Sequence, residues 1–200
     1  MEFKQLVVER YASRNFTGKK IEDEKMGQLK EMVEMTPSAF NIQPWKIKVI
    51  TDSKLKEQLA PLAFGGRTQI PTCSHLLVLC ANTDWEIMIN ANIEGMRNAH
   101  VPEDGIKNYQ AALNGLFGRI SPEQRLVESQ KNVYLMAASV VYGARSLGID
   151  SCIIQGFDAA GFSKALGLPS SFVPTLLITL GYAADRSTPK SRLPVEEIFF

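Results

Sequence analysis

The sequence predicts an α+β layered domain, in which helices pack on a small central sheet. Several segments repeat apolar residues at helical spacing, and only a few short runs have the pattern of strands. The 200 residues are 45% hydrophobic and 22% charged, which is an ordinary globular composition. This length fits one domain with a substantial core. We therefore expect residues 1–200 to form a single domain.

The first half of the chain predicts two helices, a strand and a short third helix. Residues 3–11 carry one apolar helical face, and a second helix is expected over Glu22–Met35. That helix should stop before Pro37, because the residue preceding a proline disfavours the helical conformation. Residues 45–51 alternate apolar and polar side chains, which is typical of a half-buried strand. Residues 53–62 predict a short helix that breaks near its proline.

The middle of the chain is expected to form the centre of the core. Residues 76–80 predict a strand buried on both faces, and residues 85–100 predict a helix. Residues 101–120 are rich in glycine, asparagine and charge and have no clear assignment. Ser121, Pro122 and Gln124 are typical of a capped helix start, so we expect a long helix over residues 122–147. Its middle, YLMAASVVYGA, is almost free of charge and should lie in the core.

The last part of the chain predicts two more apolar segments, a short helix and an extended tail. Residues 152–154 form a short apolar segment, and residues 173–181 predict a buried strand. Asp158 should cap a helix that ends at Gly167. The polar, proline-containing tail from Asp185 ends in Ile198, Phe199 and Phe200, so we expect its apolar end to dock on another surface.

Composition excludes several classes of function. The formal net charge is +1, from 22 basic and 21 acidic residues, so no overall field favours nucleic acid or a membrane surface. No apolar run approaches the roughly 18 residues of a spanning helix, and the first residues lack a signal-peptide core. Cys73, Cys80 and Cys152 form no CxxC pair, so we expect buried, reduced thiols and no metal site. These observations predict a cytoplasmic protein.

The usual catalytic motifs are missing from the sequence. It contains no GxGxxG, GxxxxGK[ST], GxSxG or HExxH pattern. The two histidines, His75 and His100, leave few members for a nucleophile–histidine pair, and His75 is better interpreted as a strand-end residue. The sequence therefore favours either a binding protein or an enzyme whose cofactor carries the chemistry.

Three polar groups of residues remain as candidates for such a site. Arg10 and Arg14 would share one face of a helix and could bind a phosphate, although two arginines near a helix end also suit its dipole. Lys190 and Arg192 would point to one side of an extended tail, or simply be solvated. Residues 36–45, TPSAFNIQPW, place a hydroxyl and two amides on a proline-framed loop, which suits either a flat heterocycle or an ordinary turn.

The order of these motifs resembles that of the FMN-dependent nitroreductase family. Arg-x-x-x-Arg-x-Phe opens the chain, Pro-Ser-x-x-Asn-x-Gln-Pro-Trp follows the second helix, and Pro-Lys-Ser-Arg-Leu-Pro lies near the end. Gly148-Ile149-Asp150 followed by Gln155-Gly156-Phe157 is similar to the family segment that lies against the flavin. The resemblance spans essentially the whole chain.

The resemblance implies a complete set of cofactor-binding residues. Cations at four positions would hold the FMN phosphate, a proline-framed loop of the other subunit would contact the flavin, and backbone near Gly156 would face its N5 atom. The implied residues are Arg10, Tyr11, Ala12, Arg14, Pro37, Ser38, Ala39, Asn41, Gln43, Gln69, Gln155, Gly156, Lys190 and Arg192.

The resemblance also implies the fold and the reaction. The fold would be a mixed or antiparallel sheet flanked by helices, in an intertwined homodimer whose C-terminal arms are exchanged. NADH or NADPH would give a hydride to FMN N5, and a small acceptor such as a nitroaromatic or quinone would then receive it in a ping-pong sequence. Alternatives are another reaction on the same fold, such as reductive dehalogenation or flavin breakdown, and a flavin-binding protein without turnover. A purely structural homodimer is a further alternative.

Overall fold

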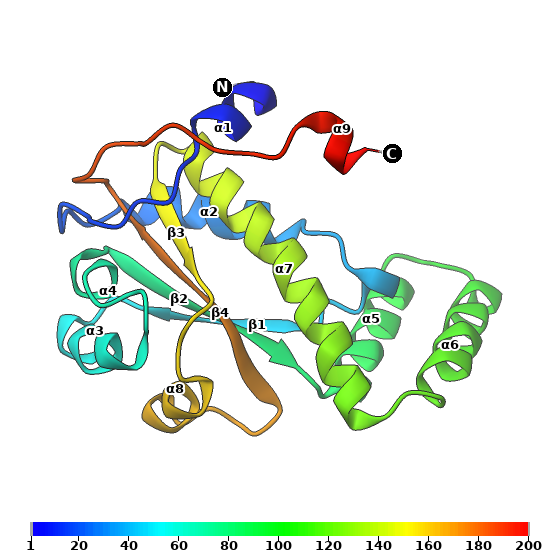
Figure 1. The fold of residues 1–200 in the computed structure, drawn as a ribbon. Helices are drawn as coiled ribbons and strands as arrows, with labels where there is room; N and C mark the ends of the chain where they lie inside the picture. The colour runs from blue at the N-terminus through cyan, green and yellow to red at the C-terminus, as the bar shows by residue number, and fades with distance from the viewer. Residues whose placement is uncertain (1, 200) are drawn as a thin grey trace.

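The computed structural model describes residues 2–199, so the prediction for Phe200 lies outside the described residues. Four strands form one sheet in the order β1-β2-β4-β3, and every neighbouring pair is antiparallel (Figure 1). The strands are β1 (Trp45–Ile50), β2 (His75–Asn82), β3 (Asp150–Ile154) and β4 (Phe172–Gly181). The predicted α+β class with an antiparallel sheet is confirmed.

Helices pack on both faces of this sheet. The α-helices of the described residues are α1 (Phe3–Glu9), α2 (Asp23–Glu34), α3 (Ser53–Leu59), α4 (Gln69–Thr72), α5 (Trp85–Asn98), α6 (Glu103–Phe117), α7 (Pro122–Ser146), α8 (Ala159–Leu166) and α9 (Val195–Ile198). The core on one face joins the sheet to α2 and α7, and the core on the other joins it to α3, α4 and α8. Figure 1 shows α5 and α6 as a hairpin beyond one end of the sheet.

Strand β2 is the central element of both cores. All eight of its residues are buried. Leu77 and Leu79 pack in the α2/α7 core, whereas Leu76 and Val78 pack in the other core, as the period of two along a strand requires. The prediction of a strand buried on both faces is therefore confirmed. The ladder to β4 shifts register where Cys80 meets Pro174, a residue without a backbone N–H to donate.

The predicted helix caps are also present. Ser121 Oγ accepts from the Gln124 backbone N–H at 3.3 Å, and the Gln124 side chain accepts from the Ser121 N–H at 2.8 Å, which completes the capping box. Asp158 Oδ1 accepts from the Gly161 N–H at 2.9 Å. Gly167 ends α8 with φ of 58°, a left-handed conformation that glycine adopts without steric cost.

Two predictions about the helical elements need correction. The unassigned residues 101–120 contain the 15-residue helix α6, whose buried Ile106, Leu113 and Phe117 recur at helical spacing. Three glycines and many polar residues in that segment obscured the pattern. The tail is extended only up to Pro194, because residues 195–198 form the short helix α9.

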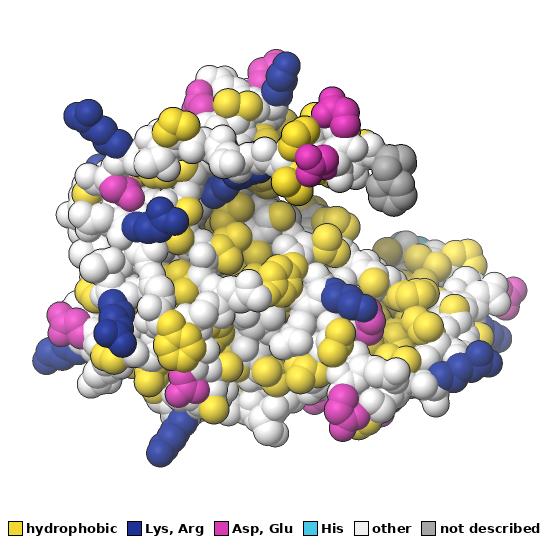
Figure 2. All heavy atoms as spheres, viewed as in Figure 1, with side chains coloured by type: hydrophobic (Ala, Val, Ile, Leu, Met, Phe, Trp, Pro, Cys, Tyr) yellow, Lys and Arg dark blue, Asp and Glu magenta, His cyan; other side chains and the backbone are white. Residues whose placement is uncertain are grey.

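Helix α7 has a second apolar face in addition to the one that packs on the sheet. Met136, Val140 and Ala144 are buried, as expected for the middle of this helix, but Tyr134 and Leu135 are 46% and 52% exposed. The prediction that this segment is central to the core is therefore confirmed for one face of the helix, and the other face is exposed. Figure 2 shows apolar side chains lining a hollow at the position of α7, between the tail and the α5–α6 hairpin. No helix within residues 2–199 is long and apolar enough to cross a membrane.

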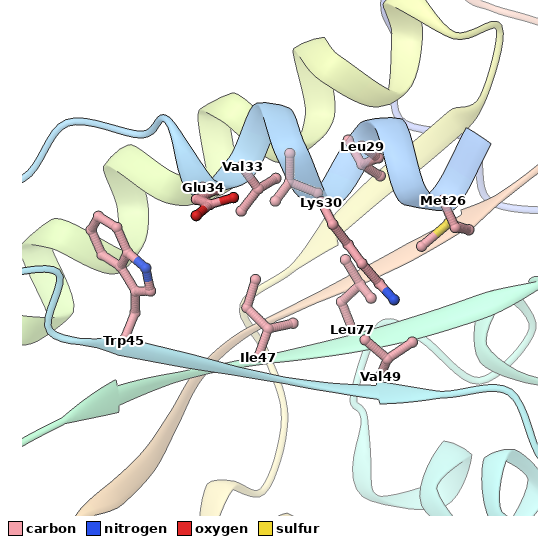
Figure 3. A pocket seen from close by; sticks show the side chains of 10 residues that line it. Met26, Leu29, Lys30, Val33, Glu34, Trp45, Ile47, Val49 and Leu77 are labelled. Atoms are coloured by element: carbon pink, nitrogen blue, oxygen red, sulfur yellow. The ribbon is translucent and has the colours of Figure 1, made fainter. Parts of the chain in front are cut away.

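A second apolar surface lies between α2 and the edge strand β1. A groove of about 310 Å³ lies between them, lined by Met26, Leu29 and Val33 of α2 and by Trp45, Ile47 and Val49 of β1. Figure 3 shows these side chains from close by. Lys30 and Glu34 line it from α2. None of the predicted cofactor-binding residues contributes to this groove.

Candidate cofactor-binding site

The predicted arginine pair lies in an extended segment that follows α1. Helix α1 ends at Glu9, and Ala12 forms a parallel bridge with Ser151 on β3. The Ser13 N–H donates to Ser151 O at 3.1 Å. The helical basis for pairing Arg10 with Arg14 was therefore wrong. Alternate residues of extended backbone also share a face, so the two side chains can still act together.

The start of the tail is fixed against this segment by Asp185. Its carboxylate accepts from Ser13 Oγ at 2.6 Å and from the Arg14 backbone N–H at 2.7 Å. Tyr11 Oη donates to the Asp185 carbonyl at 3.1 Å. These bonds join two regions that lie at opposite ends of the sequence.

Lys190 joins the tail to the N-terminal segment at a second point. Its Nζ donates to the carbonyls of Val7, at 2.7 Å, and Val8, at the end of α1. A cation suits this position because helix C-termini carry partial negative charge. Desolvation, followed by the charges of Arg10 and Arg192, lowers the pKa of Lys190. Cations from the two ends of the chain therefore lie close enough to repel one another, which is the arrangement that an anion stabilises.

Two buried polar atoms near the arginines have no hydrogen-bond partner in the described part of the chain. Gln69 is 2% exposed, and its Nε2 donates to Cys152 Sγ at 3.4 Å. Its Oε1 is buried and has no hydrogen-bond partner within residues 2–199, and Ser151 Oγ is in the same situation. Burial raises the pKa of the Cys152 thiol, while the charges of Arg14 and Arg10 oppose that shift. Cys152 and the Gln69 amide that contacts it therefore lie near the arginines.

Gln155 and Gly156 follow β3 directly and are exposed. The Gly156 carbonyl accepts from the Phe64 N–H at 2.8 Å, which ties this segment to the loop after α3. A Cβ built on Gly156 would be 3.7 Å from the Phe64 ring, an ordinary contact. Packing within the described chain therefore does not require glycine at this position.

The proline-framed loop has a rare backbone conformation. Phe40, Asn41 and Gln43 have φ of 54°, 53° and 52°, in the left-handed region. Such residues cost roughly 1–3 kcal/mol each unless glycine occupies the position. The Gln43 N–H donates to Ser38 Oγ at 2.9 Å, and Gln43 Nε2 donates to Asn41 Oδ1 at 3.1 Å. The predicted ligands Ser38, Asn41 and Gln43 therefore form one connected polar edge.

Helix α7 holds the beginning of this loop. The Ala39 N–H donates to Asn132 Oδ1 at 2.9 Å, and Asn132 is itself fixed by a 2.8 Å bond to the Glu128 carbonyl. Pro37 and Ala39 are exposed beside this contact.

The structure thus places the predicted residues in two separate groups. The first contains residues 10–14, Gln69, Gln155–Gly156, Lys190 and Arg192, and the second contains residues 37–43. Helix α7 contacts both groups. Its Asn132 binds the loop of the second group, and its Arg145 pairs with Glu9 and Asp150, at 3.0 and 3.1 Å, beside the first group. At about 1.5 Å per residue, these two positions are roughly 20 Å apart along the helix.

The family model described as "Nitroreductase family" matches residues 7–182. The chain belongs to the nitroreductase family. A nitroreductase family protein from Streptococcus pneumoniae has a solved structure with a TM-score of 0.89, 30% identity, and coverage of 100% of this chain and 99% of that one. The nitroreductase-like fold predicted from the sequence is therefore confirmed.

Other relatives extend the comparison to cofactors. The oxygen-insensitive NADPH nitroreductase of Helicobacter acinonychis is 27% identical over 96% of this chain and 92% of its own length. A protein from Exiguobacterium sibiricum assigned as a nitroreductase was solved in complex with FMN. It has a TM-score of 0.89 and 26% identity, covering 99% of this chain and 96% of that one.

Several residues that build the site are not evident from the sequence. Asp185 and Asn132 bind backbone N–H groups of predicted ligand segments, yet each lies far from them along the chain. Ser151 adds a buried, unpartnered hydroxyl next in sequence to Cys152, which the Gln69 amide contacts. A polar residue inside the otherwise apolar face of α7 was an available signal for Asn132, whereas nothing local distinguishes Asp185.

Proposed function

We propose that this member of the nitroreductase family is an FMN-dependent oxidoreductase that uses NADH or NADPH to reduce small acceptors such as nitroaromatics or quinones. The observation that carries the proposal is the contact of Lys190 with the end of α1, which brings the tail cations near Arg10, together with the unpartnered Gln69 Oε1. A ligand that offers both a phosphate and a heterocyclic N–H matches these two features, and FMN is such a ligand. The FMN complex of the Exiguobacterium relative supports the same assignment.

Each group of residues has a separate task in this proposal. Arg10, Arg14, Lys190 and Arg192 would hold the phosphate by charge-assisted hydrogen bonds. Gln69 would accept from the ring system, with Tyr11, Ala12 and Gln155 lying alongside it, and the backbone at Gly156 would approach the reactive edge. Bound FMN would supply hydride transfer from NAD(P)H to the acceptor in ping-pong order.

The second group reaches the same cofactor only in an assembly of two chains. Residues 37–43 lie roughly 20 Å along α7 from the first group, so we propose that Pro37, Ser38, Ala39, Asn41 and Gln43 contact the flavin bound mainly by the partner subunit. The apolar hollow over α7, with Tyr134 and Leu135, is a suitable surface for this homodimer.

The C-terminal arm is proposed to cross to the second copy. Leu193, Val195, Ile198 and Phe199 are 63%, 63%, 54% and 74% exposed, which is unfavourable for a free tail. The groove between α2 and the edge strand β1 is apolar and lies beside unpaired strand edge, so we propose it as the seat of the partner's arm.

A titration with FMN tests the cofactor assignment. Arg14→Ala and Arg192→Ala should each lose about 1.5–3 kcal/mol of binding free energy, because each removes a charge-assisted contact. That loss corresponds to a rise in Kd of roughly tenfold to a hundredfold. Arg119→Ala, which removes an equal charge from an exposed position after α6, is the matched control. Unchanged Kd values in both site variants would refute the assignment.

Stopped-flow absorbance tests the reaction. Mixing the FMN-loaded protein with NADH or NADPH should bleach the flavin band, and adding a nitroaromatic or quinone should restore it. Failure of both nucleotides to bleach the band would favour a flavin-binding protein without this turnover.

A further inference from the structure

The α5–α6 hairpin makes direct contact with the backbone of the strained loop. Tyr109 Oη on α6 donates to the Phe40 carbonyl at 2.9 Å. Asn92 on α5 donates from Nδ2 to the Asn41 carbonyl, and its Oδ1 accepts from Asn41 Nδ2 at 3.4 Å. Two side chains on two different helices therefore bind two consecutive carbonyls of the loop.

These carbonyls belong to the two consecutive left-handed residues. Phe40 and Asn41 have φ of 54° and 53°. Asparagine adopts this region several-fold more often than most residues, but phenylalanine has no such preference. A strained backbone of this kind persists only where its surroundings hold it. Tyr109 and Asn92 are placed to do so from one side, opposite the Asn132 contact at Ala39.

The hairpin is a firm support for these contacts. Phe117 and Leu113 of α6 are buried with Trp85 of α5 in one apolar cluster. The Phe40 ring packs edge-on against Phe117 with centroids 6.2 Å apart. Burial raises the pKa of the half-buried Tyr109, so its hydroxyl stays protonated at neutral pH and can donate.

We propose that Tyr109 and Asn92 are positioning residues that hold residues 38–43 in the conformation that presents Ser38, Asn41 and Gln43 to the flavin. This inference rests on the proposed function. It assigns a structural role to the α5–α6 hairpin, which contributes none of the predicted cofactor ligands. It also predicts that removing one hydroxyl from α6 weakens cofactor binding without touching the cofactor.

The test compares Tyr109→Phe with Tyr142→Phe in the full-length protein. Tyr142 lies on α7, about 15 Å farther along the helix than Asn132, and packs on Phe3. The measurements are the Kd for FMN by flavin fluorescence and Tm of the cofactor-free protein. Tyr109→Phe should raise Kd about threefold to tenfold, as expected for one neutral hydrogen bond. Its Tm should match that of Tyr142→Phe, which should bind FMN like the wild type.

A second substitution separates positioning from general stability. Phe40→Asn, added to Tyr109→Phe, replaces a poor left-handed residue by a favourable one. The double variant should therefore bind FMN more tightly than Tyr109→Phe alone. A mere defect in the α5–α6 packing would not be repaired by this change.

The outcomes distinguish this inference from the proposed function. If the wild type binds FMN and Tyr109→Phe binds it equally well, the positioning role is refuted while the proposed function stands. If Tyr109→Phe binds FMN weakly and Phe40→Asn gives no recovery, the conformational explanation is refuted. If the wild type does not bind FMN, both proposals are refuted.

Discussion

At the scale of single residues, Gln69 has an unfavourable environment in the protein without ligand. Its Oε1 is buried and unpartnered within the described chain, next to a thiol that is a weak hydrogen-bonding group. A buried acceptor without a donor costs about 1–3 kcal/mol. We interpret this unpartnered group as one kept for a ligand.

Gln69→Met tests this interpretation through two effects of opposite sign. The apolar side chain has a similar length, so the cofactor-free protein should gain about 1 kcal/mol in free energy of unfolding. Binding of FMN should weaken, because the acceptor for a ring N–H is gone. Denaturant unfolding and FMN titration measure the two effects. A loss of stability together with unchanged FMN affinity would show that Gln69 serves the fold alone.

Gly156 allows a second test at this scale. A methyl group at this position meets only ordinary contacts within the protein, 3.7 Å from the Phe64 ring. Gly156→Ala should therefore leave Tm nearly unchanged and still weaken FMN binding, if the backbone approaches the ring closely. Comparable Tm and comparable affinity would place the flavin elsewhere.

At the scale of secondary-structure elements, the start of α2 is linked to the end of β4. The Tyr182 hydroxyl donates to Glu22 Oε2, and Lys25 Nζ donates to Tyr182 Oη at 3.2 Å. The Tyr182 hydrogen bond, with smaller contributions from a backbone hydrogen bond and from Lys25 and Lys19, lowers the pKa of Glu22 from 4.5 to about 2. This link therefore depends on the ionised carboxylate.

The pH dependence of this link follows from the direction of the shift. Because the folded-state pKa is depressed, the contribution is complete above pH 4.5 and is lost as the pH falls toward about 2. Glu22→Gln should therefore destabilise the protein at pH 7 and bring variant and wild type closer together in acid. Denaturant unfolding at several pH values measures this. A difference that stays constant from pH 7 to pH 2.5 would contradict the assignment.

At the scale of the whole molecule, three of the apolar surfaces exposed on the described chain bear on its assembly. They are the outer face of α7, the groove between α2 and β1, and the C-terminal arm. The proposed homodimer would cover all three. The same assembly would bring the two groups of cofactor-binding residues together.

Two variants test the dimer at different surfaces. Leu135→Asp places a charge on the outer face of α7, and deletion of residues 193–200 removes the arm. Both should shift sedimentation from dimer toward monomer and weaken FMN binding, because each site would lose its second group of residues. Gln58→Asp, which adds the same charge at an exposed position of α3 on the other side of the sheet, should leave the dimer intact. A wild type that sediments as a monomer would refute the assembly.

Local patterns in the sequence were sufficient for most of the fold. The strand β2, the capping box at Ser121 and the left-handed Gly167 all follow from interactions within a few residues. The order of the three motifs was sufficient for the family. Such features are encoded locally, because periodicity, caps and turns depend on near neighbours.

Only the tertiary structure decided how the site is assembled. The extended path of Arg10–Arg14 depends on pairing with Ser151, and the support of Phe40 depends on Tyr109. These partners are distant in sequence and have no local signature, so no pattern could reveal them. The roughly 20 Å between the two groups of predicted residues is likewise a property of the folded helix α7. The sequence by itself therefore determined the elements and the family, whereas the packing of distant segments decided which residues can act on one cofactor.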